Sequence, residues 1–186
     1  NRLERPSVDL ASAENEYIDQ VGEYYHEIGR ELYVLDLTTD LGIPVFASIS
    51  YRTDSEAADE VLYAFGAHVE AGIALERAVI ELNQLLPLAD KVDGAYRIDD
   101  PVFVDWLESV RIKDQPWLQP APDLQRNIKT DFPPLCNAAI HDAEHFSVDT
   151  AKEAGLETMV LDVTQHAGCE SLCSWLASLL APNRTG

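Results

Sequence analysis

The spacing of apolar residues along the chain predicts a series of helices. Apolar side chains recur every three or four positions in residues 13–29, and Gly29 is a typical helix stop. The same period is present in residues 72–86 and 101–110, and a further helical stretch covers 141–154. In residues 101–110 the apolar positions gather on one side, which is typical of a helix that packs on a core.

Two apolar runs between the first two helices predict a pair of strands. Residues 32–38 (LYVLDLT) are continuously apolar, as in a buried strand, and residues 45–50 (VFASIS) alternate. The turn between them, marked by Gly42 and Pro44, is too short for a crossover, so the strands should be antiparallel. Residues 1–12 are expected to form an extended arm. The pattern as a whole predicts a mixed α/β fold of helix–strand units with a partly antiparallel sheet.

The remaining segments carry weaker patterns. Residues 54–63 are expected to form a short acidic helix or turn, and residues 111–135 a proline-rich loop, which at that length is usually functional. Residues 158–164 (TMVLDVT) repeat the core of 32–38, either because buried strands use few residue types or because a helix–strand unit is duplicated. The tail, 166–186, has a helical apolar face formed by Cys169, Leu172, Cys173, Leu176 and Leu180.

The composition is that of one folded domain. The chain has 186 residues, of which 46% are hydrophobic and 25% charged. Its net charge of −20 repels phosphate backbones and anionic lipid, so we expect no nucleic-acid or membrane partner. A nucleotide is still compatible, because a divalent cation can bridge carboxylates to phosphates.

Sequence signals for secretion are absent, and we expect a cytoplasmic protein. The three cysteines do not describe a disulfide framework, and no apolar run has the ~20 residues of a membrane helix. No signal peptide opens the chain. Because it starts without Met, we expect it to be a piece of a longer protein.

One polar line interrupts the apolar helix over 72–86. Arg77, Glu81 and Gln84 fall at i, i+4 and i+7 and therefore share one side. The line is either the solvent face of a core helix or the wall of a site, in which a carboxylate ligates Mg²⁺ and an amide or Arg orients a phosphate.

Other candidate residues carry weaker signals. His141 and His145 are one helical turn apart, but Asp142 stands where a zinc protease motif needs Glu, which favours a surface helix. Cys169 and Cys173 fit an apolar face, and Cys136 has no adjacent base. Two aspartates at strand ends, Asp36 and Asp162, either make hydrogen bonds in turns or belong to a site. Residues 183–185 match a glycosylation triplet, but the chain shows no secretory signal.

Four segments resemble successive parts of the YcaO domain, in the family's order and over roughly residues 1–165. They are NRLERPSVDL, VLDLTTDLGIPVFASIS, FGAHVEAGIALERAVIELNQ and AGLETMVLDVTQ. The third, with its Gly-x-His and Glu-x-x-Gln elements, is the most specific. The resemblance implies the C-terminal part of a YcaO-like fold over 1–165, followed by a divergent tail over 166–186. It is strongest to the branch that forms thiazole- and oxazole-type rings in ribosomal peptides.

The resemblance implies an ATP- and Mg²⁺-dependent peptide cyclodehydratase. In that family a Cys, Ser or Thr side chain of the substrate attacks the preceding amide carbonyl, ATP phosphorylates the oxygen, and phosphate leaves to give an azoline ring. By motif match, Glu81 and Gln84 stand at the positions that face Mg²⁺-ATP, with Glu81 as the metal ligand. Arg77 and His68 lie in the same motif and are weaker candidates for cofactor binding.

The resemblance also implies partners and alternatives. The substrate would be a ribosomal precursor peptide, delivered by an E1-like, leader-peptide-binding domain, and a homodimer is plausible in such a family. Family members carry an acidic motif, a Ser followed by Glu-x-x-Glu, which does not occur in this sequence. The residues after Gln165 also depart from the family's pattern. The alternatives are therefore a truncated or degenerate piece that only binds peptide or a partner, and an ATP-dependent enzyme that forms a thioamide.

Overall fold

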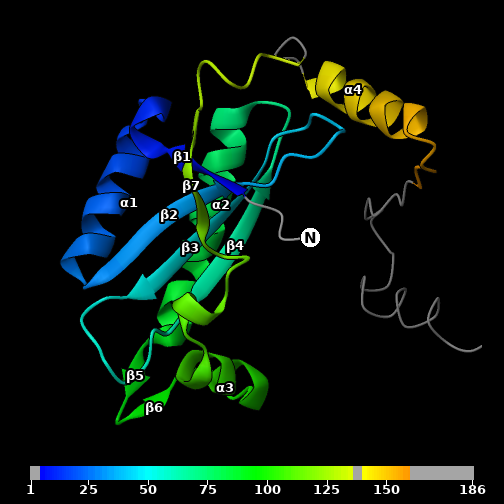
Figure 1. Cartoon of the computed structure of the whole chain (residues 1–186). Coiled ribbons are helices and arrows are strands. Elements are labelled where there is room, and N and C mark those ends of the chain that lie inside the picture. Colours follow the sequence, from blue (N-terminus) through cyan, green and yellow to red (C-terminus); the bar gives the residue numbers. More distant parts are fainter. Residues whose placement is uncertain (1–4, 136–139, 160–186) are drawn as a thin grey trace, which may run out of the picture.

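The core of the fold is a mixed five-stranded sheet. The computed structural model describes residues 5–135 and 140–159. The strand order in the sheet is β4-β3-β2-β1-β7, and Figure 1 labels each of these strands. β1 is antiparallel to β2 and parallel to β7, and β2, β3 and β4 are successively antiparallel. The strands are β1 (Arg5–Asp9), β2 (Arg30–Asp36), β3 (Val45–Arg52), β4 (Leu62–Ala67) and β7 (Pro120–Asn127).

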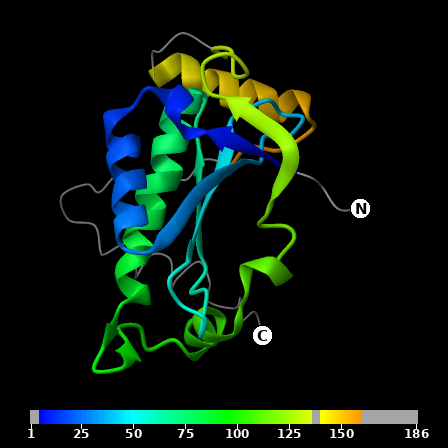
Figure 2. The ribbon, with the colours of Figure 1, turned by 60° about the vertical axis from the view of Figure 1, so that its left-hand side comes forward.

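Two helices cover one face of this sheet. They are α1 (Glu16–Glu27) and α2 (Ala71–Leu85), which lie side by side in Figure 2. α2 packs on β4 and β3, while α1 packs on β2. Beyond α2 the chain forms a small hairpin and a third helix, and α4 follows β7 at the opposite end of the molecule (Figure 1). These are β5 (Lys91–Val92), β6 (Ala95–Tyr96), α3 (Pro101–Ser109) and α4 (Ile140–Glu153).

The hydrophobic core lies between the sheet and the two helices. Its fully buried members come from α1, β2, β3, β4 and α2, and include Ile18, Tyr25, Val34, Phe46, Leu75 and Leu82. A smaller cluster covers the other face of the sheet, where Leu118 and Trp106 pack on Leu35, Ile49 and Val61. Aromatic rings continue this cluster outward, since Tyr63 makes edge contacts with both Trp106 and Trp117.

Local sequence signals explain where the helices begin and end. The Asn15 side chain accepts the N–H groups of Tyr17 and Ile18 and caps α1. Asp100 caps α3 in the same way, with Pro101 in the first helical position. Gly29, with φ of 71°, ends α1 in the left-handed conformation that glycine adopts most easily.

The structure confirms the mixed α/β fold, the helices predicted over 13–29, 72–86, 101–110 and 141–154, and the antiparallel pair over 32–38 and 45–50. The helical tail predicted over 166–186 lies outside the described residues. Three predictions need correction. Of the helix and the turn expected for residues 54–63, the structure has bends and no helix, and β4 begins within them at Leu62. The proline-rich loop, 111–135, contains the edge strand β7.

The third correction concerns the extended arm predicted over residues 1–12. Its extended residues form β1, which lies inside the sheet between β2 and β7. Of the predicted strand over 158–164, residues 160–164 lie outside the described residues. Within the part of the chain that the structure describes, no helix has the length and apolarity to cross a bilayer.

Candidate functional site

The polar line is carried by a helix that is firmly fixed on the sheet. The inner side of α2 is completely buried at Ala74, Leu75, Ala78, Val79 and Leu82. Burial of so many apolar side chains stabilises the position of the helix by several kcal/mol, at roughly 25 cal/mol per Å² removed from water. Side chains on its outer side are therefore held on a rigid support.

Arg77, Glu81 and Gln84 are all exposed on the outer side of α2. Ile80, between them in the sequence, is an exposed large hydrophobic residue, with 43% of its surface accessible. Arg77 is also tied to the sheet, because its Nη1 donates to the carbonyl O of Ala67 at 3.1 Å. The structure thus places the predicted line on one accessible surface that begins at the end of β4.

His68 lies at the same end of β4 as Arg77. Its backbone N–H donates to the carbonyl of Pro44 at 3.2 Å, and its Nδ1 accepts the N–H of Glu70 at 3.0 Å. The second bond leaves Nε2 as the ring nitrogen available to other groups. His68 is therefore oriented by the turn that leads into α2.

A pocket of about 670 Å³ joins these two residues. His68 and Arg77 line it together with Ile43, the residues next to His68 and one side of α4. Its remaining lining residues are Ile43, Ala67, Val69, Ala143, Glu144, Ser147 and Val148. Glu81 and Gln84 continue along α2 outside this lining, so the structure brings His68 and Arg77 together and leaves the Glu-x-x-Gln pair on the adjoining surface.

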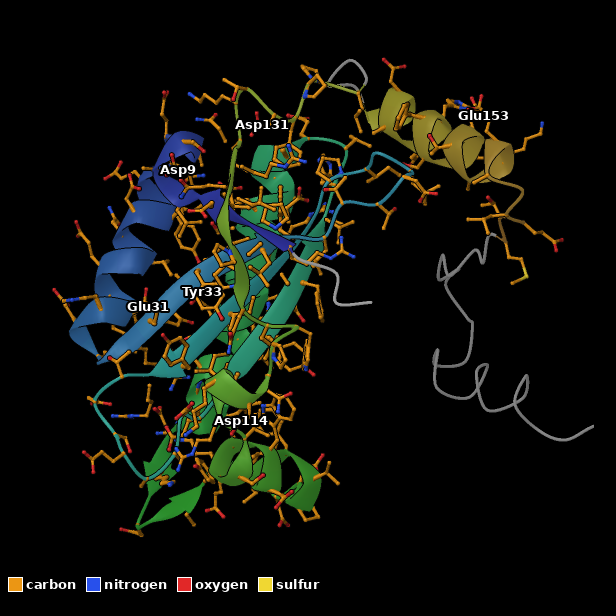
Figure 3. All side chains as sticks on the ribbon, viewed as in Figure 1. Asp9, Glu31, Tyr33, Asp114, Asp131 and Glu153 are labelled. Carbon is orange, nitrogen blue, oxygen red and sulfur yellow. The ribbon has the colours of Figure 1, made fainter. Side chains whose placement is uncertain are left out.

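The residues present fit part of a Mg²⁺-nucleotide site. Mg²⁺ in nucleotide sites is commonly held by one or two carboxylates together with phosphates and water, so a single exposed Glu81 suits that role. Among the described residues no cluster of three or more His, Cys, Asp or Glu side chains could hold a metal by itself. In Figure 3 the labelled acidic residues Asp9, Asp114 and Glu153 lie on widely separated elements.

The other predicted candidates have structural roles or lie outside the description. Asp36 is buried, accepts the N–H of Thr38 at 2.8 Å and pairs with Nε of Arg126 at 3.4 Å, as expected of a turn residue. His145 is exposed on α4. The side chain of His141 is not described. The remaining candidates lie outside the described residues: Cys136, Asp162, Cys169, Cys173 and 183–185.

Two residues that support α2 were not predicted from the sequence. Gly66 is part of β4 and lies directly under α2. Ser48 is fully buried in β3, and its hydroxyl donates to the carbonyl of Ala78 at 2.6 Å. A buried serine inside an apolar strand was the signal for the second, because a buried hydroxyl must find a partner.

The sequence profile of one family matches residues 1–174, and that family is described as the YcaO cyclodehydratases, which bind ATP and Mg²⁺. The chain belongs to the YcaO family. The match includes the whole sheet, α2 with its polar line, and α4. A comparison with curated proteins finds no match.

Two solved structures of heterocyclases are similar to the chain. A heterocyclase in complex with substrate and cofactor is 37% identical, with a TM-score of 0.75, and the match covers 83% of this chain and 20% of that chain. The heterocyclase TruD is 32% identical, with a TM-score of 0.70 and the same coverage of 83% and 20%. The chain therefore spans about a fifth of the length of each of these relatives.

A more distant YcaO protein shares the fold. The structure of YcaO from Methanopyrus kandleri bound with AMPPCP and Mg²⁺ is 19% identical, with a TM-score of 0.50, and the match covers 83% of this chain and 38% of that chain.

Proposed function

We propose that this chain forms one wall of the Mg²⁺-ATP site of a peptide cyclodehydratase. The observation that carries the proposal is the exposure of Glu81 and Gln84 on a helix whose opposite side is fully buried. Such a helix presents its polar side chains at fixed positions, as a site that must hold phosphates in one geometry requires. Family membership and the similarity to heterocyclases support the same reading.

Each residue of the line has a distinct proposed role. Bound ATP would supply the phosphoryl group that converts the backbone amide oxygen of the peptide into a leaving group. The Glu81 carboxylate would hold Mg²⁺, and the Gln84 amide would orient a phosphate or a metal-bound water. Arg77 and His68 would line the adjoining pocket and place donors toward negatively charged groups.

The proposed substrate is a ribosomal precursor peptide whose Cys, Ser or Thr residue becomes an azoline. In this proposal a leader-peptide-binding, E1-like domain delivers the peptide, and the protein forms a homodimer. A thioamide product would use the same ATP site, and product analysis by mass spectrometry separates the two, because cyclodehydration removes one water (about 18 Da) from the peptide.

A second candidate function is that of a binding module without catalysis. In this alternative the chain only binds peptide or a partner and takes no part in catalysis. It predicts that removing the Glu81 carboxylate changes neither nucleotide binding nor turnover.

The test is substitution of two residues of the polar line in the intact protein. Glu81→Ala and Gln84→Ala are compared with Glu23→Ala, which removes an exposed glutamate from α1. Calorimetry with Mg²⁺ and a non-hydrolysable ATP analogue measures binding, and phosphate release with peptide measures turnover. We expect both line variants to weaken binding and lower turnover while Glu23→Ala behaves as the wild type. Equal behaviour of all three variants would overturn the roles proposed for Glu81 and Gln84 and favour the non-catalytic alternative.

A further inference from the structure

The backbone of α2 lies close against the sheet at Gly66. A Cβ atom at this position would lie 2.2 Å from the carbonyl O of Ala74 and 2.3 Å from the backbone N of Ala78. Both are backbone atoms of α2, so no side chain can rotate away to make room. Gly66 is not among the glycines with positive φ, and its absent side chain is therefore needed for space rather than for backbone conformation.

Small residues on the helix complete this contact. Ala74 and Ala78 are fully buried and turn toward β4, so the backbones of helix and strand meet without bulky side chains between them. The distance of α2 from the sheet is consequently set by backbone contact. Such a contact is stiff, because packed interiors have few voids into which a helix can move.

A buried hydrogen bond fixes the same turn of the helix from the neighbouring strand. Ser48 pairs with Ala64 across β3 and β4, two residues along the strands from the pair formed by Phe46 and Gly66. The Ser48 hydroxyl is completely buried and donates to the carbonyl of Ala78 at 2.6 Å. A helix carbonyl has a second lone pair for such a bond, so the bond links helix to sheet without breaking the helix.

We propose that Gly66 and Ser48 are positioning residues for Glu81 and Gln84. Together they set how deeply α2 sits on the sheet and how it is rotated, at Ala78, one turn before the Glu-x-x-Gln pair. This inference rests on the proposed function, because it acts through the Mg²⁺-ATP contacts of those two side chains. Addition of one methyl group at position 66 displaces α2 by about 1 Å to restore ordinary contact distances. A displacement of that size can lower turnover by about 10²-fold.

The experiment compares Gly66→Ala with a matched methyl addition on α2 itself. Gly72 is exposed near the start of the helix, and a Cβ there meets nothing within 4 Å, which makes Gly72→Ala the control. In the intact protein we expect Gly66→Ala to weaken binding of Mg²⁺ with a non-hydrolysable ATP analogue and to lower turnover about 10²-fold. The KM for peptide should be unchanged, and Gly72→Ala should match the wild type.

A double-mutant cycle with Glu81→Ala separates the two proposals. If Gly66 acts through Glu81, Gly66→Ala weakens binding little further once Glu81 is replaced. Independent, additive losses would overturn the positioning role and leave the proposed function intact. So would a Gly66→Ala protein that melts at a lower temperature but binds the analogue as tightly as the wild type. A Glu81→Ala variant that binds normally overturns the proposed function, and the positioning role with it.

Ser48 provides the second variant if Gly66→Ala does not fold. Ser48→Ala removes the hydroxyl without adding volume, and the Ala78 carbonyl keeps its helical partner. We expect weaker analogue binding that Ser48→Cys, with a similar size and a weak donor, partly restores. Equal binding by the wild type, Ser48→Ala and Ser48→Cys would overturn the role of the hydroxyl in positioning α2.

Discussion

Arg30 and Glu60 form a buried ion pair at the end of the sheet remote from His68. Nη1 of Arg30 lies 3.8 Å from Oε2 of Glu60, and Nη2 donates to the Glu60 carbonyl O at 2.5 Å. Burial lowers the pKa of Arg30 from its ordinary value, while the Glu60 carboxylate opposes that shift, so the guanidinium stays charged. The same carboxylate accepts the Tyr96 hydroxyl and pairs with Lys91, which joins the β5–β6 hairpin to the sheet.

Removal of the Glu60 carboxylate should therefore destabilise the protein strongly. Glu60→Ala leaves Arg30 as a buried charge without its partner, and breaking such a pair commonly costs about 3–5 kcal/mol. Urea unfolding followed by circular dichroism measures the loss. The control is Lys129→Ala, which breaks an exposed pair with Glu14 and should cost about 0–1 kcal/mol. A loss for Glu60→Ala as small as that for Lys129→Ala would show that the pair contributes nothing to stability.

Tyr25 should make the protein sensitive to alkali. Burial raises the pKa of its phenol well above the ordinary value near 10, and the charge of Arg30 only partly opposes this. Because the folded pKa is raised, the stabilising contribution is complete below pH ~10 and is lost as the pH rises above 10 toward the folded pKa. The free energy of unfolding should thus fall steeply above pH ~10.

Tyr25→Phe tests this pH dependence. The variant loses the hydrogen bond from the Tyr25 hydroxyl to Oδ1 of Asn83, about 1 kcal/mol near neutral pH, but its stability should fall less steeply above pH ~10. Urea unfolding at a series of pH values from 7 to 11 measures both effects. Tyr24→Phe, on the exposed side of the same helix, is the control. An unchanged slope in Tyr25→Phe would assign the alkaline loss to other groups.

Gly29→Ala should destabilise the end of α1. At φ of 71° a residue with a side chain is strained by about 1–2 kcal/mol, and the new Cβ would lie 2.6 Å from the Asp54 carboxyl group. That carboxylate is held by Arg52 through two hydrogen bonds, so it moves only if they break. Thermal unfolding of Gly29→Ala and Gly22→Ala gives the comparison, because position 22 in α1 has open space for a methyl group. Equal melting temperatures would contradict the steric argument.

The elements predicted correctly are those whose apolar residues face a single core. α1, α2 and α3 each bury one side, and β2 and β3 are buried centrally, so their periods are visible in the sequence. β7 has the opposite character. Only Ala121 of β7 is buried, and its two prolines are tolerated because it is an edge strand paired with β1 alone. No local pattern marks such a strand.

β4 was missed for a different reason, which also concerns the site. Its inward residues toward α2 include Ala64 and Gly66, which are small because the helix backbone lies against them. Small residues weaken the β-strand pattern that larger ones would produce. The exposure of Glu81 and Gln84 could be predicted from their spacing. A serine inside an apolar strand signals that its hydroxyl needs a partner, but the sequence does not say which one, since the partner carbonyl lies 30 residues away.

Removal of Mg²⁺ should abolish the contribution of Glu81 to nucleotide binding. If the carboxylate acts through the metal, wild type and Glu81→Ala differ in affinity for an ATP analogue with Mg²⁺ and converge when EDTA removes it. A tenfold difference with Mg²⁺ present corresponds to about 1.4 kcal/mol. Without the metal the wild-type carboxylate faces phosphates of like charge, so Glu81→Ala should then bind at least as tightly. A difference that persists in EDTA would mean that Glu81 contacts the nucleotide directly and is not the metal ligand.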